Sequence, residues 1–384
     1  MPRFICEVKT LTKEKLKVIL KMMLPALPPA LLYIIFLLVT GNDIATSVYI
    51  KKFSMPLQHV LGKISSLVPL SLMEICYAVL IIWLLYFLGK TIYNVVKKDR
   101  SAYLFIKRIF TVFVVFFYIV SLYSLLFGVD YYGESFPEKA DWQEVEAISK
   151  DDLIAVTEFF AQNAAYYSTI VPRDEDGSVI KDVDNILSYA SLCYDGIYSQ
   201  FPFLEGEIFT PKRVIFSVIM SYLGFTGVYF PFTGESNINI HSPAAFIPAT
   251  VAHEIAHQKG ITSEAECNFV AVLACITSED VNYIYSGYLK GLVHLMNALY
   301  TADREAWSAI AATFTPELAH DWNENNEYWS EMEISITKIS ESVYDGYLKN
   351  YGEELGMESY GACVLLLVDY FSRLGLLGEA PSIW

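Results

Sequence analysis

Three long apolar runs near the amino end constrain the fold of this chain more than any other feature. They cover residues 22–40, 67–88 and 110–127 and carry almost no charge. Each has about 18 to 22 residues, enough to cross a bilayer core of about 30 Å at 1.5 Å per residue. Buried core helices are the alternative, but three such runs in succession favour membrane spans. We therefore predict a three-helix membrane anchor over residues 1–127 and a separate domain over residues 128–384.

The charges that flank these runs predict how the chain crosses the membrane. Basic side chains outnumber acidic ones by six to two in residues 1–21, and by six to one in residues 89–109. Cytoplasmic flanks carry such an excess, so both segments are expected in the cytoplasm. An odd number of spans then places residues 128–384 outside it, together with residues 41–66, whose three lysines oppose this orientation slightly. The prediction is a multi-pass protein of the cell membrane, with the lipid bilayer as a partner.

The domain after the third run is strongly acidic. Residues 128–384 contain 38 Asp and Glu against 12 Lys and Arg, and the whole chain has a net charge of −16. Such a surface repels nucleic acid and anionic lipid, so neither is an expected partner.

Residues 253–257 of this domain carry the H-E-x-x-H pattern of zinc metallopeptidases. On a helix, His253 and His257 lie one above the other and reach a single ion. Glu254 lies beside the first histidine, where a carboxylate can take a proton from a zinc-activated water. Zn²⁺ is therefore the expected cofactor and Glu254 the expected catalytic base.

Two histidines need a third protein ligand, and the segment after the motif offers two candidates. Gly260 is expected to end the motif helix, and Ser263 to open the next one. Glu264, with Asn268 one turn later, resembles the ligand helix of glutamate-type zinc peptidases, the gluzincins. That resemblance implies Glu264 as a zinc ligand and Asn268 as its hydrogen-bonding support. Glu266 is the alternative ligand, although a glutamate three residues after Ser263 can also close a capping box.

Several segments together resemble one bacterial membrane family. PFTGESNIN (231–239), IPATVAHEIAHQKGI (247–261), EAECNFVAVLAC (264–275), VYDGYLK (343–349) and ESYG (358–361) are similar to the family known as domain of unknown function 3810. The family combines N-terminal spans with a zinc-peptidase domain inferred from its motif. The resemblance implies a gluzincin-like zincin fold, a mainly α domain of the α+β class with a small sheet.

Local patterns outline the same domain. Helices are expected at 149–167, 185–201, 264–277 and 281–301, and a short strand at 236–240. In zinc peptidases of this kind, an edge strand before the motif helix pairs with extended substrate. Glu235, Asn237 and Asn239 alternate along this candidate strand and are candidate substrate-binding residues, with a polar surface hairpin as the equal alternative.

Tyr347 and Tyr360 are candidates for stabilising the tetrahedral intermediate. No C-x-x-C pair occurs among the six cysteines, which argues against a cysteine zinc site, and buried free thiols are expected at Cys267 and Cys275. The predicted function is a membrane-anchored zinc metallopeptidase that hydrolyses peptide bonds. The alternative is a zinc-binding membrane sensor or scaffold with little or no turnover.

Overall fold

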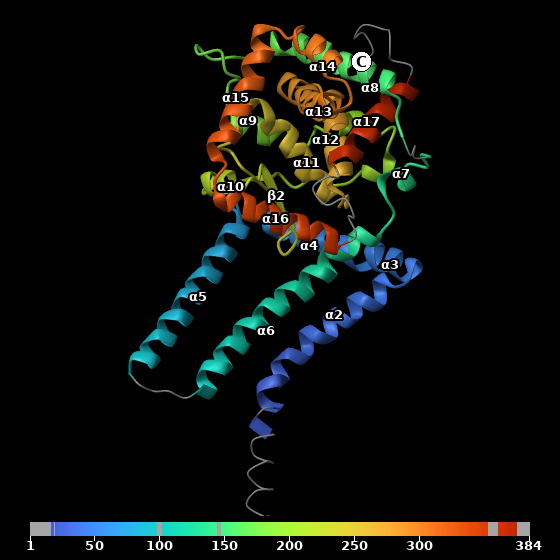
Figure 1. Cartoon of the computed structure of the whole chain (residues 1–384). Helices are drawn as coiled ribbons and strands as arrows, with labels where there is room; N and C mark the ends of the chain where they lie inside the picture. Colours follow the sequence, from blue (N-terminus) through green and yellow to red (C-terminus); the bar gives the residue numbers. More distant parts are fainter. Residues whose placement is uncertain (1–16, 19, 98–101, 144–146, 352–359, 375–384) are drawn as a thin grey trace, which may run out of the picture. The chain divides into compact units, whose positions relative to one another are not determined.

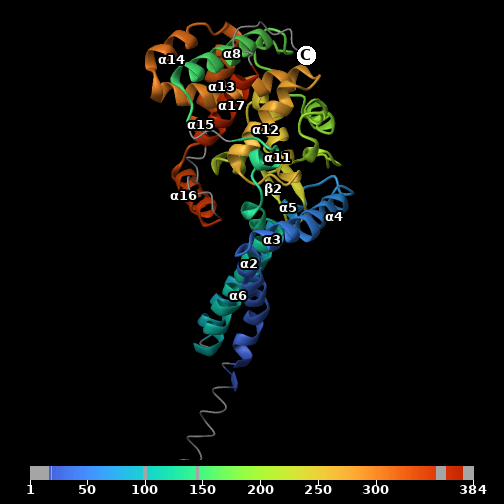
Figure 2. The same ribbon diagram turned by 90° about the vertical axis from the view of Figure 1, so that its right-hand side faces the viewer.

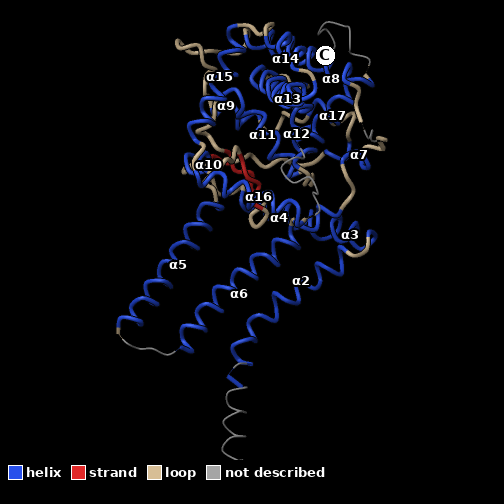
Figure 3. Tube along the Cα trace, viewed as in Figure 1, coloured by secondary structure: helices blue, strands red, loops and turns tan. Residues whose placement is uncertain are grey.

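The computed structural model describes residues 17–18, 20–97, 102–143, 147–351 and 360–374. Most of these residues are helical, and a small sheet of three strands lies among the helices (Figure 3). The predicted secondary-structure content, mainly α with a small sheet, is confirmed.

Packing divides the chain into two compact units. The first consists of residues 1–54 and 74–129, and the second of residues 55–73 and 130–384. The second half of the segment between the first two apolar runs and the first residues of the second run, 55–73 in all, therefore belong to the unit that contains the H-E-x-x-H motif.

The first unit contains three helices long and apolar enough to cross a membrane, as predicted. The second span begins at Leu72 rather than at residue 67, because residues 66–70 form turns and bends. The third begins at Leu104 rather than at 110, because the helix continues through Lys107 and Arg108. The α-helices of this unit are α2 (Leu27–Thr40), α3 (Asp43–Tyr49), α5 (Leu72–Val96) and α6 (Ala102–Leu126) (Figure 1).

The second unit is built from short and medium helices around a buried core. Its α-helices are α4 (Met55–Ser65), α7 (Phe136–Lys139), α8 (Lys150–Ser168), α9 (Val183–Tyr189), α10 (Ser217–Tyr222), α11 (Ile247–Gln258), α12 (Glu264–Ile276), α13 (Val281–Ala302), α14 (Arg304–Ala311), α15 (Pro316–Met332), α16 (Ser335–Asn350) and α17 (Tyr360–Arg373).

Helix α13 lies at the centre of this core and packs against α8, α11, α12 and α17 (Figures 1 and 2). Two glycines of α13, one turn apart, allow α8 and α12 to pack closely against it. A Cβ on Gly291 would lie 2.4 Å from the ring of Phe160 on α8, and one on Gly287 would lie 2.5 Å from Cβ of Cys275 on α12. Cys275 and Cys267 are both buried free thiols, as expected.

The prediction of a helix over residues 185–201 is wrong for the second half of this segment. Helix α9 ends at Tyr189, and turns with a 3₁₀ segment at Asp195–Ile197 follow. Gly196 approaches the carbonyl of Thr277 so closely that a Cβ would lie 2.3 Å from it. The buried side chains of Tyr194 and Ile197 anchor this irregular path in the core, and this long-range packing overrides the local helical pattern.

The sheet has the order β1-β3-β2, with β1 (Lys212–Arg213) parallel and β2 (Gly227–Phe230) antiparallel to β3 (Glu235–Ile238). The predicted strand is present as β3, but it is the central strand and its backbone is paired on both sides. The prediction of an edge strand at this position is therefore wrong.

Helix α4 packs against the motif-bearing domain. The amide of Gln58 donates to Asp130 at 2.8 Å, and Lys212 donates to the carbonyl of Ser65 at 2.8 Å. Gly62 meets Gly234, which has φ +66°, so closely that a side chain on Gly234 would overlap the α4 backbone.

Candidate metal centre

Helix α11 presents both motif histidines on one face. Pro248 lies in its first turn, where the missing N–H costs no hydrogen bond. Gly260 follows the helix end with φ +78°, a left-handed conformation that favours glycine. The four-residue spacing brings the rings of His253 and His257 together, with centroids 5.1 Å apart. The predicted motif helix and its glycine stop are both present.

Helix α12 brings a carboxylate to these imidazoles. Oε2 of Glu264 lies 3.1 Å from Nε2 of His253, and its Oε1 lies 3.7 Å from Nε2 of His257. The three side chains are only 14%, 7% and 18% exposed, in the order His253, His257, Glu264. The turn at Gly260 is short enough to fold the start of α12 back onto the end of α11, and this places the three groups together.

The Nδ1 atom of each histidine ring lies within hydrogen-bonding distance of a protein oxygen atom. Nδ1 of His253 lies 3.2 Å from Oδ1 of Asn268, whose amide nitrogen donates to the carbonyl of Glu264 at 2.8 Å. Nδ1 of His257 lies 2.9 Å from the carbonyl of Ile261. We therefore assign the ring hydrogens to Nδ1, which leaves the lone pair of each Nε2 facing Glu264. A carboxylate facing these two nitrogens is stabilised either by a proton on Nε2 or by a cation bound between them, so this arrangement fits a bound metal.

Burial and neighbouring groups set the charge states of this cluster. Burial, with a further contribution from His253, lowers the pKa of His257 to about 4, although Glu264 opposes the shift. Burial alone would raise the pKa of Glu264, but its contacts with His253, His257 and Tyr344 outweigh burial and hold the pKa at about 2. A neutral imidazole and an ionised carboxylate are the forms that bind a metal ion.

Cys267 adds a further donor close to the histidines. Its Sγ lies 3.4 Å from Nδ1 of His257, and one donor atom from each of His253, His257 and Cys267 lies within 4.8 Å of the others. This buried group could hold a metal ion. However, Sγ also contacts the carbonyl of Ile261 at 3.3 Å, and the same oxygen binds Nδ1 of His257. The cysteine lies on the Nδ1 side of that ring, whereas Glu264 lies on the Nε2 side.

Glu254 is buried between the motif helix and strand β2. Its side chain is 3% exposed, and its Oε2 has no hydrogen-bond partner among the described residues. Burial, with a further contribution from Glu264, raises the pKa of this carboxyl well above its ordinary value. Gly227 of β2 makes room for the carboxylate, because a Cβ there would lie 2.5 Å from Oε1. A buried oxygen that no protein group satisfies is suited to hold a water or an ion.

Glu266, the alternative ligand, lies elsewhere. Its Oε1 accepts a hydrogen bond from the backbone N–H of Phe136 at 2.8 Å. The side chain of Ser263 makes no capping bond to α12, so the alternative role of Glu266 in a capping box is not seen either. Glu266 therefore ties the start of α7 to α12, and of the two candidate glutamates only Glu264 contacts the histidines.

Tyr344 of α16 is a site residue that sequence reasoning missed. Its hydroxyl donates to Oε1 of Glu264 at 2.5 Å. The predicted Tyr347 lies one turn further along α16, with its hydroxyl 3.5 Å from that of Tyr131, and its ring stacks on Tyr344. The side chain of Tyr360 lies outside the described residues. Of the two tyrosines in the VYDGYLK segment, the first is therefore the one that contacts Glu264.

The three candidate substrate-binding residues are buried in the sheet. Glu235 pairs with Lys212, Asn237 accepts from the hydroxyl of Ser71 at 2.6 Å, and Asn239 donates to a hydroxyl of α10 at 2.9 Å. Each is at most 3% exposed. They hold the central strand against β1, α10 and the loop before α5, and they do not line an open cleft.

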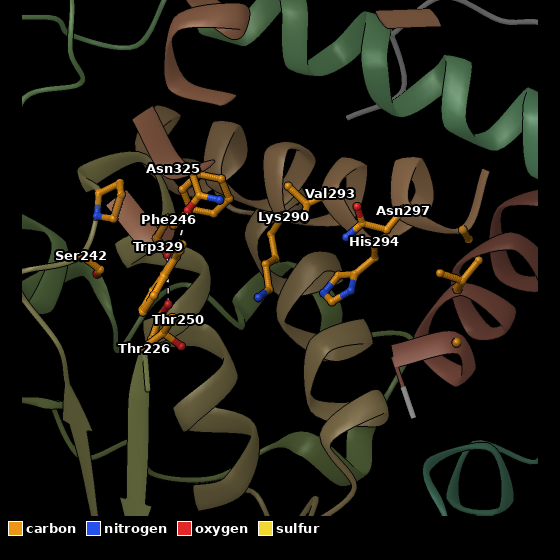
Figure 4. A pocket seen from close by; sticks show the side chains of 14 residues that line it. Thr226, Ser242, Phe246, Thr250, Lys290, Val293, His294, Asn297, Asn325 and Trp329 are labelled. Carbon is orange, nitrogen blue, oxygen red and sulfur yellow. Dashed lines mark hydrogen bonds between the residues drawn. The ribbon is translucent and has the colours of Figure 1, made fainter. Parts of the chain in front are cut away.

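A pocket of about 390 Å³ adjoins the motif helix (Figure 4). Thr250 lines it from α11, one turn before His253 and on the same face of the helix. Thr226 also lines it and directly precedes Gly227, the residue that faces Glu254. The other walls come largely from α13, α15 and α17, so the pocket lies beside the candidate metal centre.

Comparison with known proteins identifies the family and nothing more specific. The family model described as "Protein of unknown function (DUF3810)" matches residues 49–368. No curated protein and no solved structure matches the chain. The matched region contains the whole of α11, α12 and α16, and with them every residue of the centre described above. The chain therefore belongs to the DUF3810 family.

Proposed function

We propose that this protein is a membrane-anchored zinc peptidase that hydrolyses peptide bonds outside the cytoplasm. One observation carries the proposal. The Nε2 atoms of His253 and His257 face the carboxylate of Glu264, beside the buried Oε2 of Glu254, which has no hydrogen-bond partner among the described residues. This set of two imidazoles, one carboxylate ligand and one further carboxylate is typical of hydrolytic zinc sites.

His253, His257 and Glu264 are the proposed ligands. Glu264 is preferred to Cys267 because it faces the Nε2 atoms, whereas the thiol lies against Nδ1 of His257 and the carbonyl of Ile261. Asn268, Ile261 and Tyr344 hold the ligands in orientation through the hydrogen bonds described above. When bound, zinc supplies a Lewis acid that makes water nucleophilic near neutral pH and polarises a carbonyl.

Glu254 is the proposed general base. It is the carboxylate of the cluster that contacts neither imidazole, and its Oε2 is available to a water among the described residues. It would accept a proton from the attacking water and deliver it to the leaving amine. The walls of α11 and β2 exclude bulk solvent from this carboxylate and fix its position.

The orientation of the chain in the membrane is part of the proposal. The basic segments before the first span and between the second and third predict a cytoplasmic side for both. The docking of α4 onto the motif-bearing domain agrees with three crossings, which put residues 55–73 and 130–384 on one side. A cysteine introduced at one of the exposed loop residues 174–176 should react with an impermeant thiol reagent on intact cells. Labelling only after lysis would contradict the orientation.

Hydrolysis is tested with the full-length protein, purified in detergent and loaded with zinc. A randomised peptide library, analysed by mass spectrometry, should show cleavage by the wild type and none by Glu254→Gln at equal zinc content. Stoichiometric zinc without any cleavage would contradict the proposal and favour the sensor alternative. Cleavage that persists in Glu254→Gln would show that Glu254 is not the general base.

A further inference from the structure

Lys290 differs from every other basic side chain of the motif-bearing domain. In the described part of residues 130–374, seven Lys and Arg side chains pair with carboxylates, three donate to backbone carbonyls and one lies over a tyrosine ring. Within the same described residues, Lys290 makes no ion pair, hydrogen bond or ring contact. An ammonium group without a protein partner is exceptional in a domain with this excess of carboxylates.

The side chain of Lys290 extends from α13 into the pocket beside the metal centre, next to His294 (Figure 4). No Asp or Glu is among the described residues that line this pocket. Burial lowers the pKa of the Lys290 ammonium, and Cys363 and, from beyond ion-pair distance, Glu264 oppose this shift. The pocket therefore contains a partly buried positive charge with space in front of it, and a bound anion would stabilise that charge.

The remaining walls suit a side chain with an apolar stem and a polar end. Phe246 and Trp329 provide aromatic surface, and Thr250 and Asn297 provide polar groups. The volume of about 390 Å³ lies within the range of small-ligand pockets, which begins at about 300 Å³. A single residue of a peptide substrate is an appropriate occupant.

We propose that this pocket is a specificity site that binds a carboxylate of the peptide substrate through Lys290, and this inference rests on the proposed peptidase function. Thr250 fixes the pocket one helical turn from His253, so the recognised carboxylate lies close to the scissile bond. Its source is either an Asp or Glu side chain next to that bond or the carboxyl terminus of the peptide. The enzyme would accordingly prefer acidic sites or act near chain ends.

Two sets of matched peptides test the proposal and separate these sources. Each peptide cleaved by the full-length, zinc-loaded protein is remade with Glu or Gln on either side of the scissile bond. A second set carries a free or an amidated carboxyl terminus. A charge-assisted hydrogen bond predicts that kcat/KM for the acid exceeds that for its neutral counterpart by about tenfold or more in one set. That set identifies the source of the carboxylate.

The same ratios are then measured in variants. In Lys290→Met the ratio should fall to about one, and in Lys290→Arg it should remain above one. The control is Lys338→Met, which removes an exposed lysine paired with Glu333 at 3.1 Å and should keep the wild-type ratio. A wild-type ratio near one in both sets, or an unchanged ratio in Lys290→Met, would overturn the inference.

A failure of the peptidase proposal gives a different result. If the wild type hydrolyses no peptide, the same pairs are labelled and their binding to the full-length protein is followed by fluorescence anisotropy. Preferential binding of the acid that depends on Lys290 would support the pocket as a carboxylate site without hydrolysis. Equal affinity for acid and neutral peptides in the wild type would contradict the carboxylate site.

Discussion

Replacing Gly227 with alanine should separate zinc binding from turnover. Gly227 lies on strand β2, and an added Cβ would lie 2.5 Å from Oε1, 2.7 Å from Cγ and 2.8 Å from Cδ of Glu254. These three are the nearest atoms, so the methyl group displaces the proposed base and not the proposed ligands. To restore ordinary van der Waals contact, the carboxylate must move by about 1 Å.

A displacement of this size has a predictable effect on rate. A 1 Å misplacement of a catalytic group costs about 100-fold, so kcat/KM of Gly227→Ala should fall by about two orders of magnitude. Zinc content, measured by mass spectrometry of the metal, should remain at the wild-type level because His253, His257 and Glu264 are not displaced. The peptide is whichever sequence the wild type cleaves best, and the thermal midpoint is recorded for both proteins.

The matched control is Gly346→Ala on α16, where an added Cβ meets nothing within 4 Å. It should keep wild-type activity and zinc. Wild-type kcat/KM in Gly227→Ala would refute the reasoning, since Glu254 could then not be working from its position against β2. Loss of zinc together with activity would also refute it, because the whole centre and not the base alone would have been disturbed.

Three further changes test other parts of the account. Lys212→Met leaves the buried carboxylate of Glu235 unpaired, at a cost of about 3 to 5 kcal/mol, and should lower the thermal midpoint by roughly 6 to 20 °C; an unchanged midpoint would contradict the importance of this pair. Tyr344→Phe removes the hydrogen bond to Glu264 and should weaken zinc binding by about 10- to 100-fold in a chelator competition; unchanged affinity would argue against this support. Glu266→Gln should retain full zinc affinity, and loss of zinc from this variant would make it a ligand after all.

The parts of the site that sequence could predict are local. The four-residue spacing of His253 and His257 fixes their relation on any helix, and the turn at Gly260 limits where Glu264 can lie. The apolar runs likewise define the spans through length and composition alone, although their ends depend on where turns and charged residues fall. Each of these features needs only a few neighbouring residues.

The parts that sequence missed depend on contacts between distant segments. Tyr344 reaches Glu264 across 80 positions, and only the packing of α16 reveals which tyrosine of its segment is in contact. The central position of β3 follows from pairing with the two-residue strand β1, which is too short to leave a pattern. Glu235 is buried because Lys212 pairs with its carboxylate, so the alternating polar pattern marks neither the cleft face nor the surface hairpin that the sequence left as equal alternatives.

The most direct test of the central claim is zinc K-edge X-ray absorption of the full-length protein loaded with one equivalent of zinc. Ligation by His253, His257 and Glu264 predicts nitrogen and oxygen neighbours at about 2.0 to 2.2 Å and no sulfur. Glu264→Gln should then lose zinc, and Cys267→Ala should keep both the metal and the spectrum. A sulfur neighbour at about 2.3 Å would assign the metal to Cys267, and failure to retain zinc would contradict the metal centre itself.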